Sequence, residues 1–380
     1  MTPTLRVREP QELLALIPFQ LGFQPRESVV AVSLREPRHR VGLVMRVDLA
    51  DLAQPDDGRQ LARSMVSHVA ADGGHDVVLV VYTDAPVPLA RDGDSLAWRA
   101  VGHFLGAAET FLGSIDAWVV SETGYSVLGC SDPRCCPPGG RPLTDLLSTI
   151  VGAEMVLAGA VVMETRDALA WIPRAPDLDR RRANAAANRS RHQARDGDPA
   201  ARDRWRQDGF ATWRAALDGT LAAASLGRLE AALDDVLVRD AILLSLVPGV
   251  GDLPERLLAG SDDLGRAGGV GAQERRRTDA AVGRAMAAIV DPRVGVPPED
   301  DLSSAAQRTL EGIVAHGRRD RQAPALTLLA LLTWWRGSAA RAGALLERAQ
   351  ACDPRYRLAE LLSQALVSGM APGWVRRPDS

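Results

Sequence analysis

The run DVVLVVYT, residues 76–83, is the stretch of this chain that determines its fold class. Its six central residues are apolar and follow one another without a polar interruption. A strand with one face in water alternates apolar and polar residues, whereas a strand covered on both faces does not. The run therefore predicts a strand in a sheet that other elements cover on both sides.

The segments on either side of this run alternate between strand and helix patterns. Two β-rich runs at 28–34 and 40–49 predict a hairpin. Composition and apolar spacing predict strands at 115–121 and 125–129 and helices at 58–71, 95–112 and 143–160. This alternation predicts an α/β domain with a mixed, largely parallel sheet, to which hairpins add antiparallel strands.

The strand signal ends at Pro173, and the remaining residues show helical patterns separated by Pro- and Gly-rich breakers. The charge changes at the same place. Residues 1–172 carry 14 arginines against 21 acidic residues, whereas residues 173–380 carry 31 against 27. We therefore predict two domains, an α/β domain over 1–172 and an all-α helical domain over 173–380.

One helical pair in the second domain, residues 323–356, matches the spacing of a tetratricopeptide unit. With a turn at Gly337, the small and apolar positions fall on Ala330, Ala342, Leu346, Ala349 and Pro354. Ser338 is placed to cap the second helix. A stable array needs at least three repeats and the chain offers one good copy, so an ordinary helical hairpin fits the same residues.

Composition excludes several classes of enzyme. All 45 basic residues are arginine, so no lysine is available for a Schiff base with pyridoxal phosphate, for a P-loop that binds nucleotide, or for a protein kinase. The motifs of serine hydrolases, zinc proteases and dinucleotide-binding proteins are absent from the sequence. The six histidines form no ligand pair in the sequence. Whether the protein is an enzyme stays open.

The sequence predicts a cytoplasmic protein that does not enter a membrane. The opening 14 residues mix both charges and contain no apolar core of a secretory signal. The longest apolar stretch, 149–163, contains Glu154 and is shorter than the roughly 20 residues that a membrane span needs. Cysteines in such a protein are expected to be reduced.

Three of the four cysteines, Cys130, Cys135 and Cys136, lie in the segment LGCSDPRCCPPGGRP, residues 128–142. Our first expectation is a proline-stiffened loop in which the thiols act as small apolar groups. A second interpretation is a redox switch, because Arg134 stands beside Cys135 and a cation favours a thiolate. Cys130 would then form a reversible disulfide with Cys135 or Cys136 under oxidant.

Zinc is a third interpretation of the same loop. Structural zinc sites have four ligands, and this segment supplies three sulfurs from a spacing that is unusual for zinc. Asp132 or the distant His103 would have to complete the coordination.

Three carboxylates, Asp48, Asp84 and Glu122, each come just after a predicted strand. If the strands are parallel, these side chains meet at the edge of the sheet where α/β proteins bind ligands. Grouped carboxylate oxygens suit Mg²⁺ and could support hydrolysis of a phosphoester. Asp is also common in turns and helix caps, which is the structural alternative.

Residues 174–206 contain ten arginines and five aspartates. On a helix, alanines and Ser190 share a small-residue face that would pack on a neighbour, and a second face could bind phosphates. That second face consists of Arg180, Asn184, Asn188, Arg191 and Arg195. Between Trp171 and Trp205 there is no aromatic residue to stack on a base, so we expect a solvated face and no nucleic-acid partner.

Four segments resemble the DUF4192 family of actinobacterial proteins: LGFQPRESVV, CSDPRCCPPGGRP, DPRYRLAELLSQAL and GMAPGW. The resemblance extends over nearly the whole chain, and DPRCCPPGG is its most specific part. It implies a cytosolic actinobacterial protein and supplies no catalytic or binding residue.

Together these observations predict a non-enzymatic interaction or regulatory protein whose helical half docks a protein partner or the chain's own α/β domain. The alternatives are a divalent-metal-dependent hydrolase that uses the three carboxylates, a thiol redox sensor, and a nucleic-acid binder that uses residues 174–206. Zinc and magnesium are the cofactors that these alternatives allow.

Overall fold

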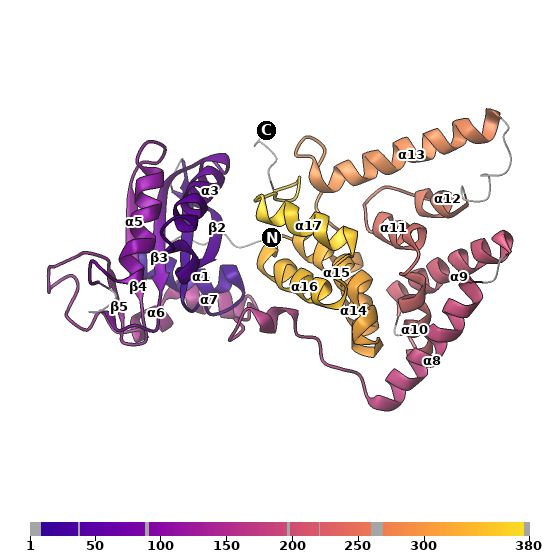
Figure 1. Cartoon of the computed structure of the whole chain (residues 1–380), viewed down its shortest axis with the longest axis horizontal. Helices are drawn as coiled ribbons and strands as arrows, with labels where there is room; N and C mark the ends of the chain where they lie inside the picture. Colours follow the sequence, from indigo (N-terminus) through magenta and orange to yellow (C-terminus); the bar gives the residue numbers. More distant parts are fainter. Residues whose placement is uncertain are drawn as a thin grey trace. The chain divides into compact units, whose positions relative to one another are not determined.

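The computed structural model describes residues 9–36, 39–87, 91–195, 198–219, 221–259 and 269–375 (Figure 1). The chain divides into two compact units, Met1–Ala168 and Leu169–Ser380. All strands of the described residues lie in the first unit, drawn from indigo to magenta in Figure 1, and the second unit is built from helices.

Five strands form one sheet in the order β2-β1-β3-β4-β5. Their bounds are β1 (Ser28–Arg35), β2 (Arg40–Asp48), β3 (Gly74–Tyr82), β4 (Ile115–Val120) and β5 (Tyr125–Val127). The sheet is mixed, as predicted, but the expectation of a largely parallel sheet is wrong. β3 and β4 pair in parallel, whereas β1–β2, β1–β3 and β4–β5 are antiparallel.

The reason lies in where β1 sits. β2 and β3 run in the same direction and are joined through α3 (Asp57–Ala71), but β1 occupies the position between them and is antiparallel to both. The crossover from β3 to β4 contains α5 (Leu96–Ala108) and joins two strands that are neighbours in the sheet, so these two strands pair in parallel.

The central strands are buried on both faces, as the run at 76–83 predicts. Val81 pairs with Val29 and Val119, and the three share a core with α3, α5 and the short α2 (Leu49–Leu52). Val30 and Val80 point to the opposite face and are also fully buried. The described residues of this unit also include α1 (Pro10–Leu21), α6 (Thr144–Leu147) and α7 (Ile150–Leu157), and α1 packs against the other two.

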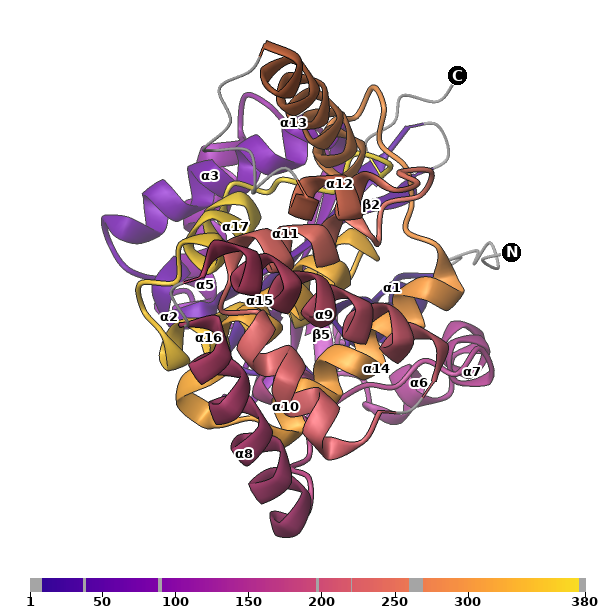
Figure 2. The ribbon, with the colours of Figure 1, turned by 90° about the vertical axis from the view of Figure 1, so that its right-hand side faces the viewer.

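The second unit is a helical assembly (Figure 2). Its buried side chains form one large apolar core. Every residue of α15 is buried, and α14, α16 and α17 pack around this helix. The helices of the unit are α8 (Asp177–Ala194), α9 (Pro199–Asp218), α10 (Ala223–Ala232), α11 (Val236–Leu244), α12 (Leu253–Ala259), α13 (Gly269–Val290), α14 (Asp300–His316), α15 (Ala323–Trp335), α16 (Ala339–Cys352) and α17 (Arg357–Val367).

A capping side chain divides one predicted helix into two. The predicted helix at 143–160 is two helices, α6 and α7, because Thr149 accepts a hydrogen bond from the N–H of Gly152 and starts α7. Helix α1, which begins with Pro10 and contains Pro18, was not predicted from the sequence.

Helices α15 and α16 pack against each other as a hairpin. The turn is at Gly337, whose φ of 92° is a left-handed conformation that favours glycine. Ser338 precedes α16 but forms no side-chain cap, contrary to our expectation. None of the helices in the described residues is both long enough and apolar enough to span a membrane.

Candidate functional site

The cysteine loop leaves the sheet after β5 and returns to it within 14 residues. Its described backbone contains no helix or regular strand, as its prolines predict. The carbonyl of Asp132 accepts hydrogen bonds from the N–H groups of Cys135 and Cys136, at 3.1 and 2.7 Å. Arg141 then pairs with Tyr125 through two backbone hydrogen bonds of 2.8 and 2.9 Å, which fixes the end of the loop.

This loop brings its three thiols together. The Sγ atoms of Cys130, Cys135 and Cys136 all lie within 4.8 Å of one another, and those of Cys135 and Cys136 are 3.8 Å apart. The single turn that Asp132 closes directs the two adjacent cysteines toward Cys130. We name this group of three cysteines the thiol cluster.

The three thiols differ in their environments. The backbone N–H of Asp132 faces the sulfur of Cys130 and, together with the neighbouring thiols, holds the pKa of Cys130 below its ordinary value. Burial raises the pKa of Cys136 to about 11, and its sulfur accepts a hydrogen bond from the N–H of Val127. Cys130 is therefore the thiolate-prone member of the cluster, and Cys136 retains its proton at neutral pH.

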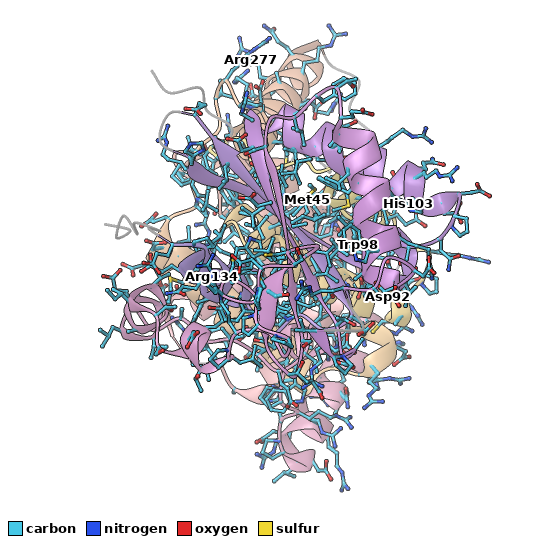
Figure 3. The ribbon with its side chains drawn as sticks, turned by 90° about the vertical axis from the view of Figure 1, so that its left-hand side faces the viewer. Met45, Asp92, Trp98, His103, Arg134 and Arg277 are labelled. Carbon is cyan, nitrogen blue, oxygen red and sulfur yellow. The ribbon has the colours of Figure 1, made fainter. Side chains whose placement is uncertain are left out.

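The guanidinium that contacts Cys135 belongs to Arg141 and not to Arg134. The guanidinium of Arg141 donates to the carbonyl of Cys135 at 2.8 Å, and its Nη2 lies 3.6 Å from the sulfur of Cys135. Arg134, labelled in Figure 3, has 93% of its side chain exposed and lies near Asp132. The sequence pattern did not identify Arg141. The turn at 137–140, which folds the chain back onto β5, is the signal that could have identified it.

The two residues suggested as a fourth zinc ligand are engaged elsewhere. The side chain of Asp132 accepts a hydrogen bond from the N–H of Arg134 at 2.9 Å. His103, on α5, has its Nδ1 2.8 Å from the carbonyl of Leu52 (Figure 3). Within the described residues, the cluster therefore consists of three sulfur ligands.

The three carboxylates reach one edge of the sheet but do not come together. β2, β3 and β4 run in the same direction, so Asp48, the last residue of β2, lies at the same edge as Asp84 and Glu122, which follow β3 and β4. However, β1 and β3 separate β2 from β4 by about 14 Å. Asp48 pairs with Arg46 at 2.7 Å, and the backbone of Asp84 donates to Glu27 at 2.6 Å.

The predicted arginine face lies on α8, but internal ion pairs engage two of its cations. Arg180 pairs with Asp177. Arg191 pairs with Asp234 at 2.7 Å and with the buried Glu230 at 3.2 Å. The other members of the face are the half-buried Asn184 and the exposed Asn188 and Arg195.

The model of the family described as "Domain of unknown function (DUF4192)" matches residues 10–373. The chain belongs to this family. The match covers both units, including the thiol cluster, so the DUF4192 description applies to nearly the whole chain. Comparisons with curated proteins and with solved structures found no match.

Proposed function

We propose that this DUF4192 protein is a regulatory protein whose thiol cluster binds one thiophilic metal ion, Zn²⁺ or Cu⁺. The observation that supports this most directly is the approach of three thiol sulfurs from a stiff loop to within 4.8 Å of one another. Thiolates are the ligands that select Zn²⁺ and Cu⁺ over hard cations such as Mg²⁺ and Ca²⁺.

The distances in the cluster agree with thiolate coordination. A zinc–sulfur bond is about 2.3 Å, so two sulfurs on one tetrahedral ion are about 3.8 Å apart. The sulfurs of Cys135 and Cys136 have this separation of 3.8 Å, and small side-chain rotations bring Cys130 to the same range. Three protein ligands leave one coordination position for an exchangeable ligand, which suits a sensor better than a closed structural site.

Metal affinity should increase with pH. A thiol must lose its proton to bind the ion, and burial raises the pKa of Cys136 to about 11. Binding therefore releases a proton from Cys136, whereas the lowered pKa of Cys130 makes its deprotonation easier. Arg141 stays beside Cys135 and offsets part of the negative charge of the bound thiolates.

The test is zinc binding by the reduced full-length protein after dialysis against a weak chelator. We expect about one equivalent of zinc to remain bound at the thiol cluster in the presence of the chelator, and the affinity of this ion to fall by more than about 100-fold in Cys130→Ala and Cys135→Ala. Cys352→Ala is the matched control, because Cys352 is a partly buried cysteine on α16. Absence of stoichiometric zinc from the unmodified protein would contradict the proposal, as would equal losses in all three variants.

A second candidate function is a thiol–disulfide sensor, which the lowered pKa of Cys130 favours. The Cys130 thiolate would attack hydrogen peroxide, forming an S–O bond, breaking the O–O bond and, with one proton, releasing water. Cys135 or Cys136 would then attack the sulfenic acid, forming a disulfide and releasing a second water. Two electrons pass from the two thiols to the peroxide.

The same samples distinguish the two candidates. After treatment with peroxide and thiol titration, a sensor loses two of its four thiols, and peptide mapping places the disulfide between Cys130 and one of its two neighbours. A protein that binds zinc and keeps all four thiols under mild peroxide supports the metal site alone.

A regulatory protein also needs a surface for a protein partner, and an apolar surface on α6 and α7 supports this part of the proposal. Helix α7 is apolar except for Glu154, and the helix buries one residue, Val151. Leu147 and Leu157 have 84% and 87% of their surface exposed. Exposed apolar surface of this kind is typical of contact sites.

We also propose that residues 323–356 form a tetratricopeptide-like unit. The buried small residues Ala330 and Ala342 on α15 and α16, and the turn at Gly337, support it. Because α15 is buried along its whole length, we infer that this hairpin contributes to the core and that a partner would contact other helices of the unit.

A further inference from the structure

We propose a second metal site in this chain, formed by Glu36, His39 and Asp76, that binds a borderline divalent ion such as Zn²⁺, Ni²⁺ or Co²⁺. Ligand atoms of these three residues all lie within 4.8 Å of one another. His75 contacts Asp76 from the other side, and we name the four residues the histidine–carboxylate cluster. It contains no cysteine and is independent of the thiol cluster.

Strand pairing assembles the cluster from distant parts of the sequence. Glu36 and His39 lie in the connection between β1 and β2, where Arg35 pairs with Arg40. Asp76 lies on β3, opposite Leu34 of β1. Because β1 pairs with both strands, the hairpin connection and the start of β3 meet at one edge of the sheet.

The distances around Asp76 fit metal coordination. Its Oδ2 is 3.3 Å from Nδ1 of His39, close to the separation of two ligand atoms that each bind one tetrahedral zinc at about 2.0–2.2 Å. Its Oδ1 accepts a hydrogen bond from the N–H of Ser114 at 2.8 Å and lies 3.1 Å from Nδ1 of His75. Asp76 thus has one oxygen held in place and one directed to His39.

His75 is a positioning residue in this arrangement. Metal-binding groups usually have a second hydrogen-bonding partner that fixes their orientation. The backbone at Gly113, just before β4, packs tightly against His75 and Asp76. A Cβ on Gly113 would lie 2.5 Å from Cε1 of His75 and 2.7 Å from Oδ1 of Asp76. Glycine at 113 therefore permits the tight packing that holds the Asp76 carboxylate.

The donor atoms determine the class of ion. Imidazole nitrogen with carboxylate oxygen suits Zn²⁺, Ni²⁺ and Co²⁺, whereas Mg²⁺ and Ca²⁺ prefer oxygen alone and Cu⁺ prefers sulfur. Two carboxylates close together also favour a cation electrostatically. The imidazoles of His39 and His75 have 60% and 66% of their surface exposed, so an ion can enter from solvent.

The experiment uses full-length Cys130→Ala protein, in which the thiol cluster is incomplete, and measures binding of Zn²⁺ and Ni²⁺ by equilibrium dialysis without a chelator. We expect about one equivalent of either ion, and a loss of affinity of roughly tenfold or more in His39→Asn. His68→Asn is the matched control, since His68 lies on α3 of the same unit and should leave binding unchanged. Glu36→Gln provides a second variant at an exposed position that should preserve the fold.

Cobalt provides a readout that does not depend on affinity. A Co²⁺ complex of this site should lack the thiolate charge-transfer band that cobalt at the thiol cluster would give. Absence of a bound ion from Cys130→Ala would overturn the proposal and leave His39, His75 and Asp76 as a hydrogen-bonded group. Binding that persists in both His39→Asn and Glu36→Gln would also overturn it. Neither outcome affects the thiol cluster, which is tested by the cysteine variants alone.

Discussion

Asp72 is a residue at which the structure allows a direct prediction of pH dependence. Its carboxylate accepts hydrogen bonds from Arg35 and Ser33, and one from the N–H of Leu43 at 2.8 Å. Burial acts to raise the pKa of this carboxyl, but these hydrogen bonds together outweigh burial and hold the pKa below the ordinary value of 3.8. The carboxylate joins β1, β2 and the end of α3.

We predict that Asp72→Asn lowers the free energy of unfolding by about 1–3 kcal/mol at pH 7, because a charged acceptor with three partners is lost. A carboxyl whose pKa is lowered by folding stabilises the protein above its unfolded pKa, and this contribution is lost as the pH falls through the folded pKa. The difference between the two proteins should therefore shrink below about pH 4. Urea unfolding, monitored by circular dichroism at several pH values, measures this difference in the free energy of unfolding.

Asp116→Asn is the control for this experiment, since Asp116 is an exposed residue on β4. We expect its effect on stability to be small at every pH. A difference for Asp72→Asn that stays constant down to pH 3 would contradict an electrostatic origin.

At the scale of residues, the sequence could identify the cysteines but not their partners. Three cysteines within seven residues are visible in the sequence, whereas Arg141 reaches Cys135 only because the chain turns back onto Tyr125. The approach of His39 to Asp76 depends in the same way on β1 lying between β2 and β3. Contacts of this kind follow from strand order, which the local pattern of apolar residues does not encode.

At the scale of elements, the contact between α8 and α10 depends on small residues. Four residues of the predicted small-residue face, Ala183, Ala186, Ala187 and Ser190, are buried, and the fifth, Ala194, is half-buried. Helix α10 lies against α8 (Figure 2), and Gly227 is the position of closest approach. A Cβ at this glycine would lie 2.0 Å from the backbone carbonyl oxygen of Ala183.

We predict that Gly227→Ala lowers the free energy of unfolding by about 3 kcal/mol, the upper end of the usual cost of overpacking, because a backbone atom cannot rotate away. Gly283→Ala on α13 is the matched control, since nothing lies within 4 Å of a Cβ there. It should raise stability by about 0.5–1 kcal/mol through the better helix propensity of alanine. Equal effects of the two substitutions in urea unfolding would show that α8 and α10 do not need close packing.

Element types could be predicted from the sequence more readily than element boundaries or pairing. The long apolar and periodic segments gave all five strands and the helices α3 and α5 close to their observed positions. Helices α10 and α11 are separate because Asp235 accepts a hydrogen bond from the N–H of Leu237 and starts α11. Such caps are single polar residues within apolar runs, so the boundaries that they set are easily missed. Helix α1 was missed for a different reason, because Pro18 interrupts its helical pattern.

At the scale of the whole molecule, the division between the two units has a physical basis in residues 169–172. Ala170 and Ile172 are buried in the core of the helical unit. Arg348 donates to the carbonyl of Ala170 at 2.8 Å, and Arg341 donates to that of Leu169 at 3.2 Å. Helix-breaking prolines and the change of charge lie after residue 172, so the boundary predicted from the sequence falls there.

We predict that fragments 1–168 and 169–380 each fold alone with a single cooperative transition, since each has its own core. A fragment that starts at residue 173 loses Ala170 and Ile172 from the helical core and removes the acceptors of Arg341 and Arg348. Its free energy of unfolding should be lower than that of 169–380 by roughly 2 kcal/mol, the value of one buried isoleucine side chain. Urea titrations of the two fragments, followed by tryptophan fluorescence, measure this difference. Equal stabilities would mean that residues 169–172 contribute nothing to the helical unit, and failure of 169–380 to unfold cooperatively would show that it depends on the first unit.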